Sequence, residues 1–183
     1  MNASSLTILI AEDSATDRML LSTIVGRQGH RVLVAANGLE ALALFESQRP
    51  QLVLMDALMP VMDGFEAARR IKAMAGEAMV PIIFLTSMSE DEALVSCLEA
   101  GGDDFLAKPY SRVILEAKIN AMDRLRRLHQ EVLRQRDQIA RHNEHLQNEQ
   151  LVAKAVFDKV AHSGCLGSCL LYTSDAADDS LRV

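Results

Sequence analysis

Short apolar runs alternate with longer amphipathic segments along the first two thirds of the chain. Five aliphatic runs predict strands at residues 7–11, 31–35, 52–55, 81–86 and 105–107. The segments between and after them carry apolar residues three or four positions apart, which predicts five helices. Strands that alternate with helices predict an α/β domain with a parallel sheet, spanning residues 1–122.

Capping signals mark several of the predicted helix boundaries. Ser14 is followed three residues later by Asp17, and Ser89 by Glu92, which is the spacing of an N-terminal cap. Pro50 ends the second predicted helix because proline cannot continue the hydrogen-bonding pattern. A final helix is expected to start near residue 111.

Polar residues gather where the predicted strands end. Glu12 and Asp13 follow the first strand, Asp56 closes the third, Thr86 ends the fourth and Lys108 follows the fifth. Because ligands of parallel sheets bind at the carboxyl ends of the strands, we expect all five residues to converge at one edge. Burying a charge at the end of a strand is also costly, so Asp56 is expected to have a charged partner or a functional role.

These residue types favour phosphoryl chemistry supported by a hard cation. Three carboxylates repel one another unless a cation joins them, and oxygen ligands favour Mg²⁺. Lys108 could contact a phosphoryl oxygen and Thr86 could donate a hydrogen bond, while Asp56 could act as a nucleophile and become an acyl phosphate. Taken singly, each residue has a plain alternative as a helix cap or a strand end.

Four motifs carry a resemblance to a known family. They read AED, LMDALMPVMDGFE, PIIFLTS and DDFLAKPY, in this order within residues 6–122. This part of the chain resembles a bacterial response-regulator receiver domain. The resemblance implies a flavodoxin-like, doubly wound five-stranded sheet in the order 2-1-3-4-5.

The resemblance also implies a role for each site residue. Asp56 would accept a phosphoryl group from a histidine kinase or a phosphotransfer protein. The side chains of Glu12, Asp13 and Asp56, with the backbone carbonyl of Leu58, would ligate Mg²⁺. The chain would then catalyse its own phosphorylation and control an output domain, rather than act as a conventional enzyme.

Further residues of the resemblance concern the response to phosphorylation. Thr86 and Lys108 would hold the acyl phosphate, and Phe105 corresponds to the switch aromatic that turns inward as Thr86 moves. The Lys108–Pro109 bond is expected to be cis, as is typical of the family.

Two apolar residues near the site predict a long-lived phosphorylated state. Leu58 and Met88 cannot orient a water for attack on an acyl phosphate, and both can shield it. We therefore expect slow self-dephosphorylation. The alternative is that both residues pack on a partner surface.

Composition excludes several other classes of protein. The net charge of −6 argues against nucleic acid as a direct partner, since phosphate binding requires a clustered basic surface. The three cysteines, Cys97, Cys165 and Cys169, have no disulfide or metal-site spacing. No leader and no membrane-spanning apolar run is present, so we expect a cytoplasmic protein without a membrane partner.

Beyond residue 122 the pattern changes to a heptad repeat. One set of positions repeats every seven residues and is apolar: Leu125, Val132, Ile139, Leu146, Ala153 and Val160. The companion set is polar in its middle: Leu128, Gln135, His142, Glu149 and Val156. We predict a coiled-coil helix over residues 123–162 that forms a homodimer of modest stability through residues 125–160. A single solvated helix that spaces two domains is the alternative.

The last segment, residues 163–183, is expected to be disordered. Residues 169–178 match the translation of a sequencing-library transposon adapter, so we exclude residues from Ser168 onward and expect the natural protein to continue past Cys165. Residues 149–166 weakly resemble the segment before serine/threonine phosphatase domains in some response regulators. We therefore predict such a phosphatase as the missing output domain. A diguanylate cyclase is the rival guess.

Three other readings of the whole chain remain open. A stand-alone receiver could signal by binding partner proteins. A receiver-like interaction protein would need no phosphorylation, but this chain retains every acid-pocket residue. A haloacid-dehalogenase-like hydrolase would need an aspartate two positions after Asp56, where Leu58 stands.

Overall fold

The computed structural model describes residues 5–87, 95–97 and 99–162. The predicted cap at Ser89, the residue Met88 and the segment 163–183 lie outside the described residues. Residues 95–97 and 99 are helical, in the region of the predicted fourth helix.

The sheet has five parallel strands in the order β2-β1-β3-β4-β5, which confirms the predicted fold class. The strands are β1 (Thr7–Ala11), β2 (Arg31–Ala35), β3 (Leu52–Asp56), β4 (Ile82–Thr86) and β5 (Asp104–Ala107). β3 and β4 are buried at every position, because helices cover both faces of the central strands.

The first three described helices begin at polar caps. The helices are α1 (Ala15–Arg27), α2 (Gly38–Gln48), α3 (Gly64–Ala75) and α5 (Arg112–His162). The side chain of Ser14 accepts a hydrogen bond from the backbone N–H of Asp17 at the start of α1. Asp63 does the same for Glu66 at the start of α3, at 2.7 Å. Each cap satisfies a backbone donor that has no partner within the helix.

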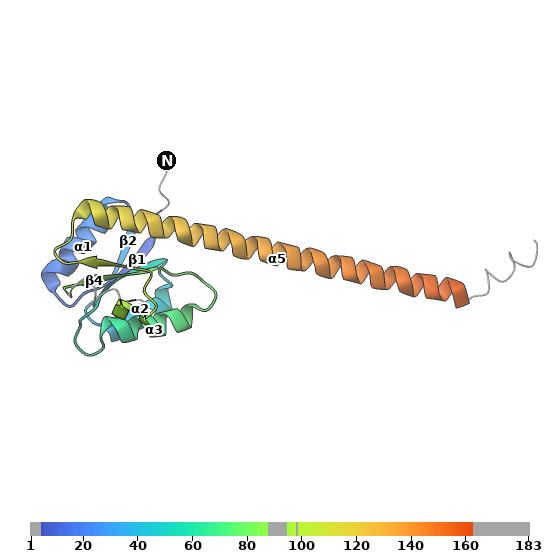
Figure 1. Ribbon diagram of the computed structural model, residues 1–183, viewed down its shortest axis with the longest axis horizontal. Coiled ribbons are helices and arrows are strands. Elements are labelled where there is room, and N and C mark those ends of the chain that lie inside the picture. The colour runs from blue at the N-terminus through green and yellow to red at the C-terminus, as the bar shows by residue number, and fades with distance from the viewer. Residues whose placement is uncertain (1–4, 88–94, 98, 163–183) are drawn as a thin grey trace, which may run out of the picture. The chain divides into compact units, whose positions relative to one another are not determined.

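Helices lie on both faces of the sheet (Figure 1), and an apolar layer fills the space on each face. Ile8 and Ile10 pack with α1 and with the first turns of α5, where Leu115 is buried. Leu9 and Ala11 point to the opposite face and pack with α2 and α3. Alternate residues of β1 thus serve the two faces, as the period of a strand requires.

The compact unit that contains the sheet ends at Glu131, and a second unit begins at Val132. Within the first unit, Arg126 donates two hydrogen bonds to Asp123, at 3.1 and 2.6 Å, and both residues are buried. The ring of His129 lies 3.0 Å from the carbonyl oxygen of Glu77. These contacts tie α5 to the domain beyond residue 122.

The part of α5 in the second unit is exposed to solvent on all sides from residue 134 to residue 159. In the described parts of the chain, no helix combines the length and the apolar character needed to cross a membrane.

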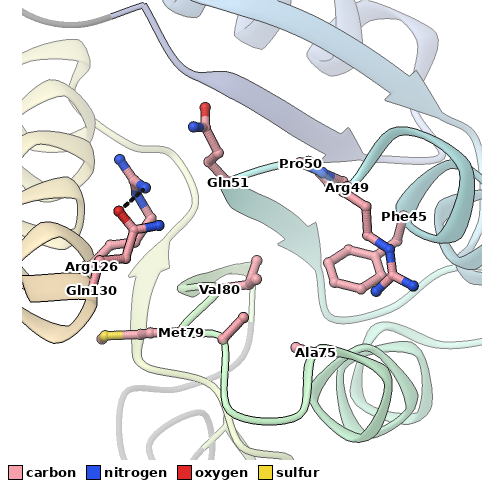
Figure 2. A pocket seen from close by; sticks show the side chains of 10 residues that line it. Phe45, Arg49, Pro50, Gln51, Ala75, Met79, Val80, Arg126 and Gln130 are labelled. Atoms are coloured by element: carbon pink, nitrogen blue, oxygen red, sulfur yellow. Dashed lines mark hydrogen bonds between the residues drawn. The ribbon is translucent and has the colours of Figure 1, made fainter. Parts of the chain in front are cut away.

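A pocket of about 160 Å³ lies at the amino ends of β3 and β4 (Figure 2). The polar groups that line it already have partners. The guanidinium of Arg49 lies 5.9 Å from the centre of the Phe45 ring, and Arg126 donates to the amide oxygen of Gln130 at 3.1 Å. The pocket therefore belongs to the packing around α5 and lies at the opposite end of the sheet from the predicted site.

Candidate functional site

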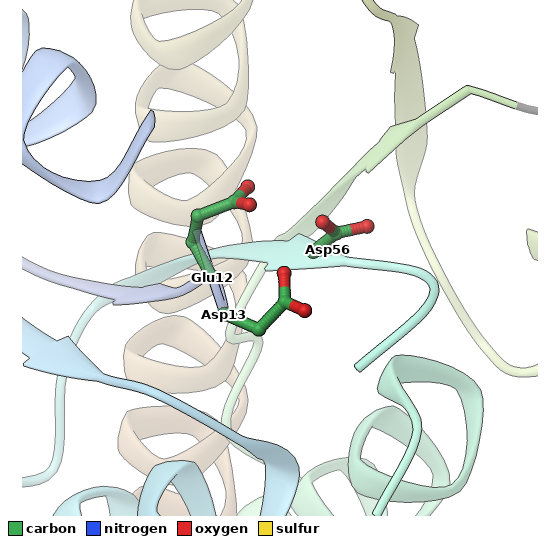
Figure 3. A group of neighbouring side chains, drawn as sticks. All are labelled: Glu12, Asp13 and Asp56. Atoms are coloured by element: carbon green, nitrogen blue, oxygen red, sulfur yellow. The ribbon is translucent and has the colours of Figure 1, made fainter. Parts of the chain in front are cut away.

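Three carboxylates meet at the carboxyl ends of β1 and β3 (Figure 3). One oxygen from each of Glu12, Asp13 and Asp56 lies within 4.8 Å of the other two. Glu12 has 0% of its surface exposed and Asp56 has 7%, whereas Asp13 is exposed. The cluster is therefore buried on one side and reachable from solvent on the other.

The pairing of the strands explains why distant residues meet. β1 and β3 are neighbours, and Ala11 pairs with Met55 at the last step of their register. The next residues along the two strands, Glu12 and Asp56, therefore leave the sheet side by side.

Lys108 completes the cluster from the end of β5. Its ammonium donates to both carboxylate oxygens of Glu12, at 3.1 and 2.8 Å, and to Asp56 Oδ2 at 2.7 Å. The backbone N–H of Lys108 donates to the carbonyl oxygen of Thr86 at 2.7 Å, which fixes the loop beside β4. A single cation thus bridges the two buried carboxylates.

Burial and the hydrogen bonds of this ion pair shift the pKa of each partner in opposite directions. Desolvation raises the pKa of Glu12, the hydrogen bond from Lys108 opposes this rise, and the charge of Asp56 adds to it. For Lys108, burial lowers the pKa, but the hydrogen bonds that its ammonium donates to Asp56 and Glu12 outweigh burial, so the pKa is raised. Lys108 therefore remains charged over the whole physiological range.

The other predicted residues lie around this cluster. Thr86 is buried at the end of β4, and Phe105 is half-buried in β5, packed against the apolar layer beneath α2 and α3. The backbone N–H of Leu58 donates to Asp56 Oδ1 at 3.1 Å, while the Leu58 side chain is 57% exposed. The Lys108–Pro109 peptide bond is cis, the isomer that the resemblance implies. Met88 lies outside the described residues.

Sequence reasoning missed residues of α1 that reach the site. Arg18 donates to the carbonyl oxygens of Glu12 and Asp13, at 2.6 and 3.2 Å, and so holds the loop that carries both acids. Asp17 Oδ2 lies 4.0 Å from the ammonium of Lys108. The one available signal was that α1 starts directly after the acidic pair, which places its first turn beside the site.

Tyr110 was also missed. Its hydroxyl is buried without a hydrogen-bond partner among the described residues. Burial, together with the negative charges of Asp17 and Glu12, raises the pKa of Tyr110 to about 12. The phenol is therefore a neutral group at the rim of the acid cluster. It lines an open pocket of about 330 Å³ with Asp17, Leu20, Lys108 and Pro109.

The donor set suits a hard divalent cation. Carboxylate oxygens are the ligands that Mg²⁺ prefers, and one open side leaves room for waters or phosphate oxygens. Lys108 adds a positive charge at hydrogen-bonding distance from Asp56. Together, these groups can bind an anionic phosphoryl group next to a carboxylate that is able to attack it.

Comparison with known proteins places this geometry in a family. The sequence profile of the response regulator receiver domain matches residues 8–120. The chain belongs to that family. The receiver domain therefore accounts for the sheet, the acid cluster and the start of α5.

Curated relatives include transcriptional regulators and a shorter protein. AfsQ1, a transcriptional regulatory protein of Streptomyces coelicolor, is 41% identical over 115 residues, which are 63% of this chain and 50% of AfsQ1. PilH of Pseudomonas aeruginosa is 36% identical over 115 residues, which are 63% of this chain and 95% of PilH. The chain thus spans about half the length of the transcriptional regulator.

Solved structures of receiver domains superpose on the same region. The chemotaxis protein CheY4 of Vibrio cholerae has a TM-score of 0.61 and 28% identity, covering 65% of this chain and 99% of CheY4. The receiver domain of the sensor histidine kinase PA1611 of Pseudomonas aeruginosa has a TM-score of 0.59 and 35% identity, covering 66% of this chain and 97% of that domain. The PA1611 structure has a magnesium ion in its active-site cleft.

Proposed function

We propose that Asp56 accepts a phosphoryl group from a histidine kinase or phosphotransfer protein in the cytoplasm, and that the receiver then controls an effector. The observation that carries this proposal is the placement of Asp56. Its carboxylate is nearly buried, lies among two further carboxylates, and is held by the ammonium of Lys108 at 2.7 Å.

The residues support an in-line transfer. One Asp56 oxygen would attack phosphorus, and the bond from phosphorus to the donor's imidazole nitrogen would break as the new bond to Asp56 forms. Glu12, Asp13 and Asp56 would hold Mg²⁺, with the Leu58 carbonyl as a further candidate ligand, and the ion would neutralise charge on the phosphoryl oxygens. Lys108 would move part of its hydrogen bonding from the carboxylates to the phosphoryl group.

Thr86 and Phe105 would report the phosphorylation to α5. Thr86 ends β4 and pairs in register with Ala107, two residues after Phe105 in β5. Next to Phe105, Asp104 accepts a hydrogen bond from the Phe105 N–H at 2.8 Å and two from the ammonium of Lys118 in α5, each at 2.7 Å. A movement of β5 at Phe105 would therefore reach α5 through Asp104.

Two surfaces would serve protein partners. The pocket beside Lys108, with Leu20 half exposed on α1, gives a phosphodonor protein an apolar contact next to Asp56. Along α5, residues 125–160 would join two copies of the chain, and the helix would carry the change toward the effector.

Loss of phosphorylation in Asp56→Asn tests the proposal. With acetyl phosphate and Mg²⁺, the wild-type chain should reach about one phosphoryl group per chain, and Asp56→Asn should remain unlabelled because an amide is not a nucleophile here. Asp17→Asn is the matched control, since Asp17 lies 4.0 Å from the same ammonium and should leave the label intact. Intact-mass spectrometry measures both. An Asp56→Asn chain that labels like the wild type would exclude Asp56 as the acceptor.

Replacement of Leu58 tests the predicted lifetime of the phosphorylated state. We expect a wild-type half-life of minutes or longer, and about a tenfold faster hydrolysis in Leu58→Asn, because an amide can orient a water that leucine excludes. Val61→Asn is the control, since Val61 is 81% exposed in the same loop and should leave the rate unchanged. Decay of the label after removal of the phosphodonor gives the rate. A wild-type half-life of seconds would contradict the expectation.

A further inference from the structure

The exposed part of α5 carries an apolar stripe with no partner among the described residues. Ile139 is 61% exposed, Leu146 is 42% exposed and Val156 is 56% exposed, although they recur at heptad spacing on one side of the helix. A lone helix gains little from such a stripe, whereas a coiled coil buries it.

We propose that a second copy of the chain packs on this stripe in a parallel orientation and in register. The inference rests on the proposed homodimer through residues 125–160 and adds its geometry. In this arrangement each seam residue faces its own counterpart across the dimer axis.

The distribution of polar seam residues favours the parallel arrangement. In register, the apolar layers at Val132, Ile139 and Leu146 remain apolar, and Gln135 and His142 each meet their own counterpart. The exception is Glu149, which would face the partner's Glu149; it lies at the end of the polar stretch, 3.2 Å from His145 of its own helix. An antiparallel coil would instead oppose Gln135 with the partner's Leu146, His142 with the partner's Ile139 and Glu149 with the partner's Val132. Each of these layers would bury a polar group against an aliphatic one, which is costly without a hydrogen bond.

Charges beside the seam also distinguish the two orientations. In a parallel coil, the residue that precedes a position of the apolar set, such as Glu131 before Val132, lies beside the partner's residue whose number is higher by five. This rule brings Glu131 to the partner's Arg136, and by symmetry the attraction occurs twice. In the antiparallel coil, Glu131 would face the partner's Val152, and Arg136 would face the partner's Asn143, with no complementary charge.

The ends of the paired segment follow the same rule. Val152 and the partner's Phe157 would meet near the end of the helix, and both residues are exposed in the single chain, by 64% and 68%. The preceding charged pair, Arg124 with the partner's His129, is not complementary. His129 already contacts Glu77 within the first unit, so this pair adds no attraction, and the charged pairing that favours the parallel register begins at Glu131.

Cysteine cross-linking in the full chain tests the orientation. Cys165 and Cys169 are replaced by Ser, and Cys97 is kept because it is buried. Val132→Cys should form a disulfide-linked dimer under mild oxidation, and Asn148→Cys, on the outer side of the helix, should not. A mixture of Val132→Cys and Glu149→Cys chains should give no mixed dimer in a parallel coil.

The outcomes separate the two proposals. A mixed Val132→Cys/Glu149→Cys dimer, without self-linking of Val132→Cys, would overturn the parallel orientation while the homodimer stands. A chain that sediments as a monomer at every concentration, without cross-links, would overturn the homodimer itself. Neither result bears on phosphorylation of Asp56, which is measured separately.

Charge reversal gives a second, independent test. Glu131→Arg and Arg136→Glu should each weaken the dimer about fivefold or more, because each turns two attractive contacts into repulsive ones. The double variant should return to within about twofold of the wild type, since the reversed charges attract again. Sedimentation equilibrium gives the dissociation constants. Unchanged constants in both single variants would contradict the parallel register.

Discussion

The Gly64→Ala variant is expected to lose about 3 kcal/mol or more of its free energy of unfolding. α3 begins directly against the end of β3, where the N–H of Gly64 donates to the carbonyl oxygen of Ala57 at 3.0 Å. A Cβ at residue 64 would lie 2.0 Å from the carbonyl oxygen of Asp56 and 3.0 Å from the Met55 side chain. The backbone of β3 would have to move, and the carboxylate of Asp56 would move with it.

Gly26→Ala is the matched control for this prediction. Gly26 is in α1, and a Cβ there would meet no atom within 4 Å. Alanine should stabilise the helix by about 0.5–1 kcal/mol, because it loses less backbone freedom on folding than glycine does. Chemical denaturation followed by circular dichroism measures both variants. A Gly64→Ala chain as stable as Gly26→Ala would show that the junction of β3 and α3 is looser than the structure describes.

The fold follows closely from the sequence because its signals are local and agree with one another. Each predicted strand is found within one residue at either end, and the predicted cap at Ser14 begins α1. The one-residue differences at the strand ends come from pairing with the neighbouring strand, which the residue types do not reveal. β3 includes Asp56 because Asp56 still pairs with Leu85, and β5 begins at Asp104 because Asp104 pairs with Ile83.

The placement of the five candidate residues at one edge was predictable because the carboxyl ends of parallel strands meet there. The placement of their neighbours was not. Arg18, Asp17 and Tyr110 are ordinary polar residues at helix starts and loops, and only the packing of α1 against the end of β5 brings them to the acids. A sequence pattern shows which residues lie on a helix, but it does not show which polar residue turns toward a neighbouring element.

The extent of the compact unit was also not predictable from the pattern. Charged residue types such as Asp123 and Arg126 give no apolar signal in a sequence, yet the structure buries both as a hydrogen-bonded pair. Each residue neutralises the charge of the other, which makes their burial possible. A hydropathy pattern reads only the residue types and therefore marks both positions as exposed. The first residues of α5, as far as Glu131, belong to the compact unit that contains the sheet.

Removal of the bridging cation is the second large effect that we expect. In Lys108→Met, the carboxylates of Glu12 and Asp56 lose the ammonium that lies 2.8 and 2.7 Å from them. An uncompensated buried charge destabilises a folded protein by about 3–5 kcal/mol, and the open side at Asp13 places this site toward the lower end. Millimolar Mg²⁺ should recover part of the loss, because a divalent cation replaces the missing charge.

The effect of pH on Lys108→Met has a definite sign. Burial already raises the pKa of Glu12 in the wild type, and loss of the hydrogen bond from Lys108 raises it further. A carboxyl with a raised pKa binds a proton more tightly in the folded state than in the unfolded one. The loss in the free energy of unfolding of Lys108→Met is therefore largest above the pKa of Glu12 in the folded state. It shrinks as pH falls from 7 toward 4.5, the ordinary pKa of a glutamate.

Lys118→Met provides the comparison that isolates the cause. Lys118 is 28% exposed and pairs with Asp104 at 2.7 Å, away from the acid cluster, so its loss should be smaller and should not respond to Mg²⁺. Urea denaturation at pH 7 and near pH 5, with and without Mg²⁺, measures both variants. Equal losses in the two variants, with no recovery by Mg²⁺ in either, would mean that Lys108 does not neutralise a buried acid pair. Rescue by both acid and Mg²⁺ in Lys108→Met alone would instead locate the repulsion at Glu12 and Asp56. A bound cation has to balance the same repulsion before an anionic phosphoryl group can approach.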